Sequence, residues 1–285
     1  MADAPHFNPL EHPACLQLPE LLDETAWAGH TPFGMFMISA LRPKILVELG
    51  TYRGVSYCAF CQAVKEVGIV TECFAVDSWE GDAHSGKLGR SVFEQLRSHH
   101  DKRYGEFSKL VRSTFDDALK LFEDKSIDLL HIDGLHTYEA VRHDFNSWRP
   151  KLSKNAVVLF HDVAVRERGF GVWRFWGELS REYPSFAFSH EHGLGVIAVG
   201  DVPAPLRFLF DSETDELERI RAFFEALGDR VKKTNELRIQ KKNEPGLFRA
   251  YHVARSEGLR SLYTKARRKL KGQLRNLASP TKMKE

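Results

Sequence analysis

The chain has 285 residues, 42% of them hydrophobic, which is enough to bury a core as one domain with an extension or as two smaller domains. Its start lacks the basic and apolar regions of a secretory signal, and no run approaches the roughly 20 apolar residues of a membrane span. We therefore expect a cytoplasmic protein. The 4 cysteines are too few for a disulfide framework, so we interpret them as buried thiols, with a redox or metal role as the less favoured alternative.

Charge is distributed unevenly along the chain. Between Arg249 and Glu285 there are 11 Lys and Arg against 2 Asp and Glu, a net charge of +9. Because the whole chain carries +2, the residues before this tail carry −7. The tail is therefore chemically different from the body.

Short apolar or β-branched runs alternate with amphipathic helical stretches between positions 45 and 183. The expected strands are 45–49, 73–77, 109–113, 127–133 and 156–162, and the expected helices are 55–67, 92–96, 115–122, 138–152 and 172–183. This alternation predicts a parallel sheet with helices on both faces.

The pattern changes after Pro184. Runs 186–190 and 195–200 are separated by only four residues, too few for a helical crossover, so we expect an antiparallel pair at the end of the sheet. No strand signal follows Asp201, whereas 214–227 has helical spacing with Gly228 as its predicted C-cap. We predict a doubly wound, mainly parallel seven-stranded α/β sheet in a domain of residues 1–200, and a helical extension over 201–285.

The first predicted strand ends in a glycine turn, Glu48-Leu-Gly50-Thr51-Tyr-Arg-Gly54. Glycine there lets the backbone approach a ligand, and the following helix directs its N–H groups toward it. A dinucleotide site needs a different glycine spacing, whereas a carboxylate before the turn suits the ammonium and carboxylate of an amino acid. The alternative is a tight turn without a ligand, as in any doubly wound protein.

The next two strands also end in polar residues. Asp77, followed by Ser78, can accept hydrogen bonds from both hydroxyls of a ribose. Ser113 and Thr114 close the third strand, where an adenine would lie, although both are equally suited to cap the following helix.

The run His131-Ile-Asp133-Gly-Leu-His136 places a carboxylate at the end of an apolar strand. A buried charge costs free energy unless it is paired, hydrogen-bonded or bound to a metal, so this position indicates a ligand. The alternative is that Asp133 caps the helix near Tyr138 and His136 is an ordinary loop histidine.

Loop residues near the same edge are further candidates for the site. His84, His190 and His192 are expected there as solvated side chains, and the stretches 77–86 and 170–173 as lid or acceptor-pocket elements. Trp173 and Trp176 have the alternative of being core residues.

Taken together, the E-x-G-x-x-x-G turn, Asp77, the Ile-Asp-Gly-x-His-x-Tyr run at 132–138 and the Phe-His-Asp run at 160–162 resemble class I S-adenosylmethionine-dependent O-methyltransferases. The nearest group contains macrocin-type sugar O-methyltransferases and cephalosporin-hydroxylase-like proteins, and the resemblance covers roughly residues 30–200. It implies a Rossmann-like fold with S-adenosylmethionine as cofactor. Glu48 and Gly50 would contact its methionine moiety and Asp77 its ribose. The rest of the expected cofactor site is Thr51, Gly54, Ser78, Ser113 and Asp133.

The resemblance also implies a metal site. In metal-dependent members a carboxylate after the fourth strand and an acidic pair after the fifth hold a divalent cation, and a base lies three residues after the first carboxylate. The matching positions are Asp133, the pair His161-Asp162, and His136. Magnesium prefers oxygen ligands, whereas imidazole suits manganese, iron or zinc, so His161 is a ligand of a different metal, a group behind the ligands, or a sign that no metal binds.

The expected activity is methyl transfer from S-adenosylmethionine to a hydroxyl of a small molecule, sugar or glycan, as part of glycan biosynthesis. Asp133 and His136 are the expected catalytic residues, with His136 as the proton acceptor. Two alternatives stay open: a catalytically silent glycan-binding or scaffold protein of the same fold, and a nicotinamide-dependent oxidoreductase, whose glycine spacing would differ. A homo-oligomer is left open.

The basic tail has apolar residues at helical spacing between Leu259 and Leu277, with Lys and Arg at many of the remaining positions. Such a helix suits the anionic inner face of a membrane, as a peripheral contact. Packing of the apolar stripe on the acidic body is the alternative. We do not expect nucleic-acid binding, because the tail offers few aromatic residues for stacking.

Overall fold

The computed structural model describes residues 7–23, 25–82 and 86–243. The chain divides into two compact units, Met1–Lys233 and Thr234–Glu285. His84 and the basic run from Leu259 to Leu277 lie outside the described residues, so the expectations for them stay predictions.

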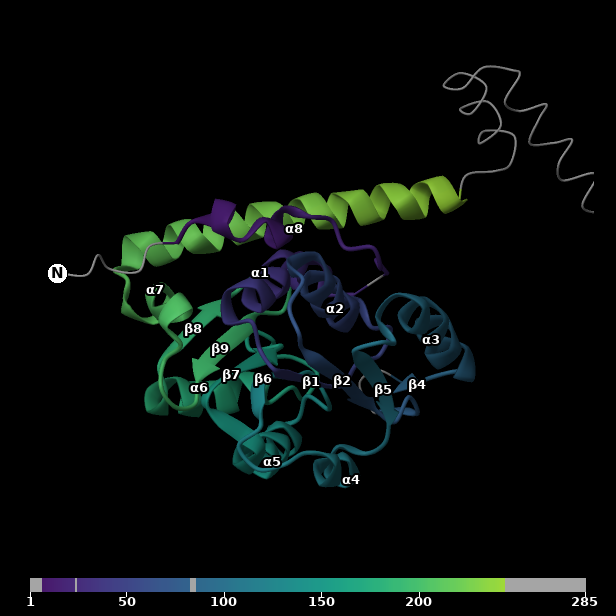
Figure 1. Cartoon of the computed structure of the whole chain (residues 1–285), viewed down its shortest axis with the longest axis horizontal. Coiled ribbons are helices and arrows are strands. Elements are labelled where there is room, and N and C mark those ends of the chain that lie inside the picture. The colour runs from purple at the N-terminus through teal and green to yellow at the C-terminus, as the bar shows by residue number, and fades with distance from the viewer. Residues whose placement is uncertain (1–6, 24, 83–85, 244–285) are drawn as a thin grey trace, which may run out of the picture. The chain divides into compact units, whose positions relative to one another are not determined.

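The described residues of the first unit contain a seven-stranded sheet in the order β5-β2-β1-β6-β7-β9-β8 (Figure 1). Its first five strands are parallel, and β9 runs antiparallel to both neighbours. This confirms the predicted doubly wound sheet with its antiparallel hairpin, in a Rossmann-like arrangement. The strands are β1 Ile45–Leu49, β2 Glu72–Asp77, β5 Ser108–Arg112, β6 Ile127–Ile132, β7 Leu152–His161, β8 Ser185–Phe188 and β9 Leu194–Ala198.

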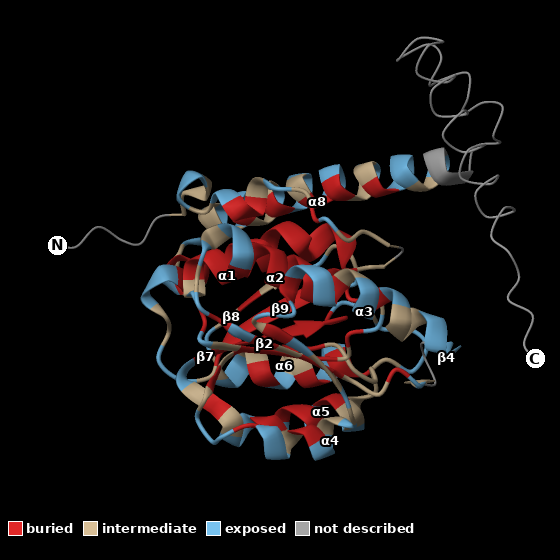
Figure 2. Ribbon diagram, turned by 45° about the vertical axis from the view of Figure 1, so that its right-hand side comes forward, coloured by how far each residue is buried: buried red, intermediate tan, exposed pale blue. Residues whose placement is uncertain are grey.

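Helices cover both faces of the sheet, with α1 and α2 on one side and α5 and α6 on the other (Figure 2). A hydrophobic core lies on each side. Cys15, Cys58, Cys61 and Cys73 are buried and unpaired, as expected. No described helix has both the length and the apolar character of a membrane span. The helices are α1 Thr31–Leu41, α2 Val55–Val67, α3 Arg90–Tyr104, α4 Phe115–Ala118, α5 Tyr138–Trp148, α6 Val172–Glu182, α7 Arg207–Asp211 and α8 Thr214–Asn243.

One helix and two short strands were not predicted. Helix α1 is buried along almost its whole length, so it lacks the alternation of polar and apolar faces by which a surface helix is recognised. The strands β3 Gly81–Asp82 and β4 Gly86–Lys87 are too short to give a pattern.

The segment between α5 and β7 differs from its prediction. The helix expected over 138–152 ends at Trp148, because Pro150 cannot donate the next helical hydrogen bond and forms part of the 3-10 turn Arg149–Lys151. Strand β7 then begins at Leu152 rather than at position 156.

Gly228 is not a helix terminus, so its prediction as a C-cap was wrong. Helix α8 continues through it to Asn243. A Cβ atom at Gly228 would lie 2.2 Å from the backbone oxygen of Gly29, so glycine here permits close approach of the helix to another backbone. The first compact unit accordingly extends past position 200 to Lys233, and Leu206, Phe208 and Phe224 belong to its core.

We predict opposite effects for two glycine-to-alanine substitutions within helices. Alanine normally stabilises a helix interior by about 0.5–1 kcal/mol relative to glycine. Gly177→Ala in α6 should show this gain, because no atom lies within 4 Å of the added Cβ. Gly228→Ala should instead lower the unfolding free energy, by about 1–3 kcal/mol, because the added methyl overlaps the Gly29 backbone. Urea unfolding of both variants measures the difference, and equal stabilisation would contradict the role assigned to Gly228.

Candidate functional site

A cavity of about 660 Å³ lies at the carboxyl ends of β1, β2, β5, β6 and β7, where the polar residues were expected to meet. Of the expected site residues, Glu48 alone does not line it. Those on its wall are Gly50, Thr51, Gly54, Asp77, Ser78, Ser113, Asp133, His136, His161 and Asp162. Sheet topology therefore brings together residues that are more than 100 positions apart in the sequence.

The glycine turn after β1 is fixed by its neighbours. Gly50 has a φ of 84°, and a Cβ atom there would lie 2.1 Å from the backbone oxygen of Asp133. Asp77 Oδ2 accepts hydrogen bonds from the backbone N–H groups of Thr51 at 2.9 Å and Tyr52 at 2.8 Å. Its Oδ1 accepts one from Trp79 N at 2.6 Å. Asp77 thus holds the turn, and Oδ1 has the lone pair left for a ligand.

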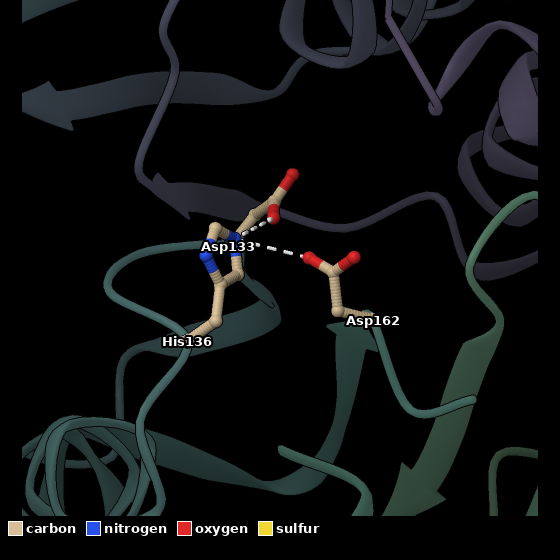
Figure 3. A group of neighbouring side chains, drawn as sticks. All are labelled: Asp133, His136 and Asp162. Carbon is tan, nitrogen blue, oxygen red and sulfur yellow. Dashed lines mark ion pairs between the residues drawn. The ribbon is translucent and has the colours of Figure 1, made fainter. Parts of the chain in front are cut away.

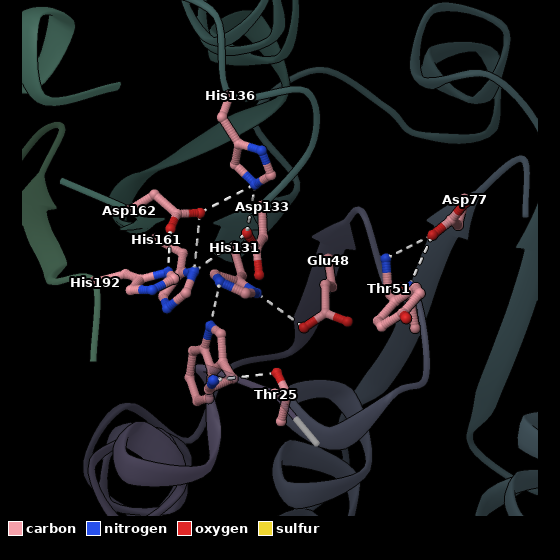
Figure 4. A network of polar contacts seen from close by, with 12 residues as sticks. Thr25, Glu48, Thr51, Asp77, His131, Asp133, His136, His161, Asp162 and His192 are labelled. Carbon is pink, nitrogen blue, oxygen red and sulfur yellow. Dashed lines mark hydrogen bonds and ion pairs between the residues drawn. The ribbon is translucent and has the colours of Figure 1, made fainter. Parts of the chain in front are cut away.

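Glu48 is fully buried behind the cavity wall and belongs to a chain of polar contacts (Figure 4). Its Oε2 lies 2.8 Å from His131 Nδ1, and His131 Nε2 lies 3.1 Å from Trp27 Nε1. Since the indole N–H only donates, His131 accepts from Trp27 through Nε2 and donates to Glu48 through Nδ1. Glu48 Oε1 has no hydrogen-bond partner among the described residues.

Residues at two strand ends were expected either to cap the following helix or to face the site, and the outcomes differ. Thr114 caps α4 by accepting a hydrogen bond from Asp117 N, and both Ser113 and Thr114 line the cavity. Asp133 does not cap α5, because Thr137 is the N-cap and accepts from Ala140 N. The Asp133 carboxylate is therefore available to the site.

Asp133 and Asp162 share two imidazoles. His136 Nε2 lies 3.0 Å from Asp162 Oδ2 and 3.6 Å from Asp133 Oδ1 (Figure 3). His161 Nδ1 lies 3.1 Å from Asp162 Oδ2 and 3.4 Å from Asp133 Oδ1. Asp162 has a φ of 62°, a left-handed conformation that is uncommon outside glycine and often marks functional sites.

These contacts shift the protonation of the whole group. Burial alone would lower the pKa of His136, but hydrogen bonds to Asp133 and Asp162 outweigh it and raise the pKa to about 9. Burial would also lower the pKa of His161. The negative charges of the same two carboxylates outweigh it and raise that pKa to about 10. The pKa values of Asp133 and Asp162 fall despite burial, mainly through His161. At neutral pH two imidazolium groups thus balance two carboxylates.

The group with metal-ligand geometry differs from the predicted one. One ligand atom from each of Asp133, His136 and Asp162 lies within 4.8 Å of the others, whereas His161 was expected as the third ligand. His161 lies behind them, with Nε2 3.2 Å from the Glu191 backbone oxygen and Nδ1 facing both carboxylates. A cation bound here would displace protons from this group.

Phe170 packs against the predicted base. It stacks on the His136 ring with centroids 4.5 Å apart and planes 3° from parallel, and Gly171 N donates to the His136 backbone oxygen at 2.7 Å. Of the predicted lid residues in 170–173, Phe170 reaches the described wall, whereas Trp173 does not. Other residues on the wall were not predicted, among them Thr25, Trp27, Tyr52, Arg53 and Phe115. The sequence alone did not predict that the strand register would place Glu48 beside His131.

The two described loop histidines are placed differently. His192 lines the cavity, with Nδ1 3.0 Å from Asp162 Oδ1. His190 lies outside the wall and next to His30, with ring centroids 4.6 Å apart. The expectation that each is merely solvated is too simple for both, because His192 contacts Asp162 and His190 Nε2 is buried.

Residues 47–163 match a family model described as a methyltransferase domain. All the predicted site residues, from Glu48 to Asp162, fall within the residues that this model matches. The cavity wall also includes residues outside this match, with Trp27 before it in the sequence and Phe170 and His192 after it.

Relatives and solved structures add the following similarities. The chain is 49% identical over 204 residues to the uncharacterized protein y4gI of Sinorhizobium fredii, an alignment that covers 70% of this chain and 22% of that protein. The chain thus spans less than a quarter of that relative's length. A putative caffeoyl-CoA O-methyltransferase from Staphylococcus aureus has 14% identity and a TM-score of 0.47, with 67% and 90% of the two chains covered. The O-methyltransferase TomG from Streptomyces achromogenes has 15% identity and a TM-score of 0.46, with 67% and 88% covered.

The Glu48 to His131 contact gives a prediction for stability. His131→Leu should lower the unfolding free energy by about 3–5 kcal/mol, because it leaves the buried Glu48 side chain without its partner. The double variant Glu48→Met/His131→Leu should lose clearly less, since it removes both polar groups together. Urea unfolding measures both. A double variant as unstable as the single one would show that the contact is not what stabilises the pair.

Proposed function

We propose that this chain transfers a methyl group from S-adenosylmethionine to a hydroxyl, and that the acceptor is a sugar or glycan. The observation that carries the proposal is a single cavity that joins the Gly50 turn and Asp77 to the group of Asp133, His136 and Asp162. The match of residues 47–163 to a methyltransferase domain supports the reaction class. The sugar acceptor rests on the motif resemblance to macrocin-type enzymes.

The glycine turn fits the methionine end of the donor. Thr51 Oγ1 belongs to a residue on the cavity wall, is buried and has no hydrogen-bond partner within the described part of the chain. A buried polar atom left without a partner costs about 1–3 kcal/mol. The ammonium of S-adenosylmethionine supplies hydrogen-bond donors of the kind that this oxygen needs, and Asp77 Oδ1 keeps an acceptor site for a ribose hydroxyl.

The sulfonium of the bound donor supplies an already activated methyl group, so the protein must orient the acceptor oxygen and take its proton. His136 is the residue assigned to that proton, because it lines the cavity between the donor side and Asp162. General-base assistance of this kind is typically worth about 10²–10⁴ in rate.

The raised pKa of His136 makes a divalent cation part of the proposal. A base must be neutral to accept a proton, and hydrogen bonds to Asp133 and Asp162 keep His136 protonated at neutral pH. If Asp133 and Asp162 held a cation such as magnesium, manganese or iron and His136 were not itself a ligand, the carboxylates would pair less with His136, and its pKa would fall toward its usual range. The cation would also lower the pKa of the acceptor hydroxyl.

The first test concerns the donor. Titration calorimetry should detect binding of S-adenosylmethionine and S-adenosylhomocysteine and no binding of NAD, because the Gly50 to Gly54 spacing does not cradle a pyrophosphate. Gly50→Ala should abolish donor binding, since its Cβ would overlap the Asp133 backbone. Tight NAD binding would overturn the assignment in favour of an oxidoreductase.

A second test concerns the base. His136→Ala should reduce turnover at saturating donor by about 10²–10⁴, with donor affinity nearly unchanged. The matched control is His143→Ala, because His143 is exposed on α5 and pairs with Asp116 away from the cavity. Release of S-adenosylhomocysteine with glycan fractions, with and without added divalent metal, measures both variants. Unchanged turnover in His136→Ala would remove His136 from the mechanism, and no release by the unaltered chain would favour a silent scaffold.

A further inference from the structure

The turn between β8 and β9 has a strained backbone. Glu191 and His192 have φ values of 49° and 69°, and Gly193 follows with 85°. The left-handed conformation costs a non-glycine residue roughly 1–2 kcal/mol. Two such residues in succession persist only where surrounding contacts hold them.

Buried histidines hold the backbone of this turn. The Glu191 backbone oxygen lies 3.2 Å from His30 Nε2 and 3.2 Å from His161 Nε2. A carbonyl oxygen only accepts, so both imidazoles donate to it. The next carbonyl, that of His192, accepts from Ala164 N at 2.9 Å. The turn is therefore tied to α1's entry and to the end of β7.

Helix α8 holds the side chain of the same turn. Lys232 Nζ lies 2.7 Å from Glu191 Oε1. A Cβ atom on Gly29 would lie 2.4 Å from Glu191 Cγ, and Gly228 lets α8 approach the Gly29 backbone. Lys232 follows Gly228 by four residues and therefore lies on the same helix face. The two glycines bring α8 close enough for Lys232 to reach Glu191.

The turn held in this way places His192 against Asp162. Its Nδ1 lies 3.0 Å from Asp162 Oδ1, while Asp162 Oδ2 faces His136 and His161 (Figure 4). His192 remains 49% exposed on the cavity wall. It thus contacts the second carboxylate of the site from the side opposite to His136.

We propose that Lys232, Glu191 and His192 form a clamp by which α8 positions the Asp162 carboxylate. His192 is a positioning residue for Asp162, and Lys232 acts on it through the strained turn. The inference rests on the proposed function and deepens it, because it assigns the orientation of one reactive carboxylate to a helix outside the methyltransferase domain.

The test uses the full chain and three variants. Lys232→Met removes the charge at the clamp, Lys232→Arg keeps it, and Lys233→Met is the matched control because Lys233 is exposed on the next helix position. Amide hydrogen exchange of residues 189–195 should become about two- to fivefold faster in Lys232→Met, the range for loss of a partly exposed ion pair. The ¹⁵N signal of His192 Nδ1 should shift in the same variant. Lys233→Met and Lys232→Arg should resemble the unaltered chain.

Activity measurements complete the test. Turnover of Lys232→Met should fall by about two- to fivefold, with affinity for S-adenosylhomocysteine unchanged, because the clamp contacts Asp162 and not the glycine turn. Unchanged exchange or an equal effect in Lys233→Met would overturn the clamp. Faster exchange with normal turnover would overturn its positioning role. If the unaltered chain transfers no methyl group, the proposed function fails by itself, and an unshifted His192 signal would separately overturn the clamp.

Discussion

Two largely buried carboxylates lie at neighbouring strand ends, and their negative charges must be balanced by hydrogen-bond donors or positive charges. This requirement determines the arrangement of the site. Asp133 follows β6 and Asp162 follows β7, and these strands are adjacent and parallel. Charged groups in such a place are stable only when paired and hydrogen-bonded. His136, His161 and His192 supply those contacts from three different elements. The three segments that carry these imidazoles are therefore bound to one another through Asp133 and Asp162.

A second buried carboxylate, deeper in the sheet, is also paired with a histidine. Glu48 and His131 are register partners on adjacent strands, and their side chains meet in the core. Trp27 completes the chain from the segment before α1. Because Trp27 also lines the cavity, that segment belongs to the site and is not a peripheral extension. The other carboxylate oxygen of Glu48 has no hydrogen-bond partner among the described residues, and Glu48 lies two positions before Gly50 of the glycine turn.

Much of the fold was predictable because it depends on local patterns. Alternating apolar runs and helical stretches identify the parallel strands, and strands that end in Asp77, Ser113 or Asp133 predict polar residues at one sheet edge. The direction of a side chain at that edge depends on tertiary contacts. The sequence therefore placed His136 and His161 near the carboxylates but did not indicate that His136 would complete the group of possible ligand atoms while His161 also donated to the Glu191 carbonyl. Gly228 shows the same limit, since its reason is the Gly29 backbone, 199 positions earlier.

The stack of Phe170 on His136 couples two properties that could otherwise vary separately. One loop supplies both an aromatic wall of the cavity and the face against which the imidazole rests, and Gly171 N ties that loop to the His136 backbone. A change in the loop that reshapes this wall would also shift the imidazole. Evolution of a different cavity shape would therefore require paired changes, in which the loop and the segment around His136 evolve together.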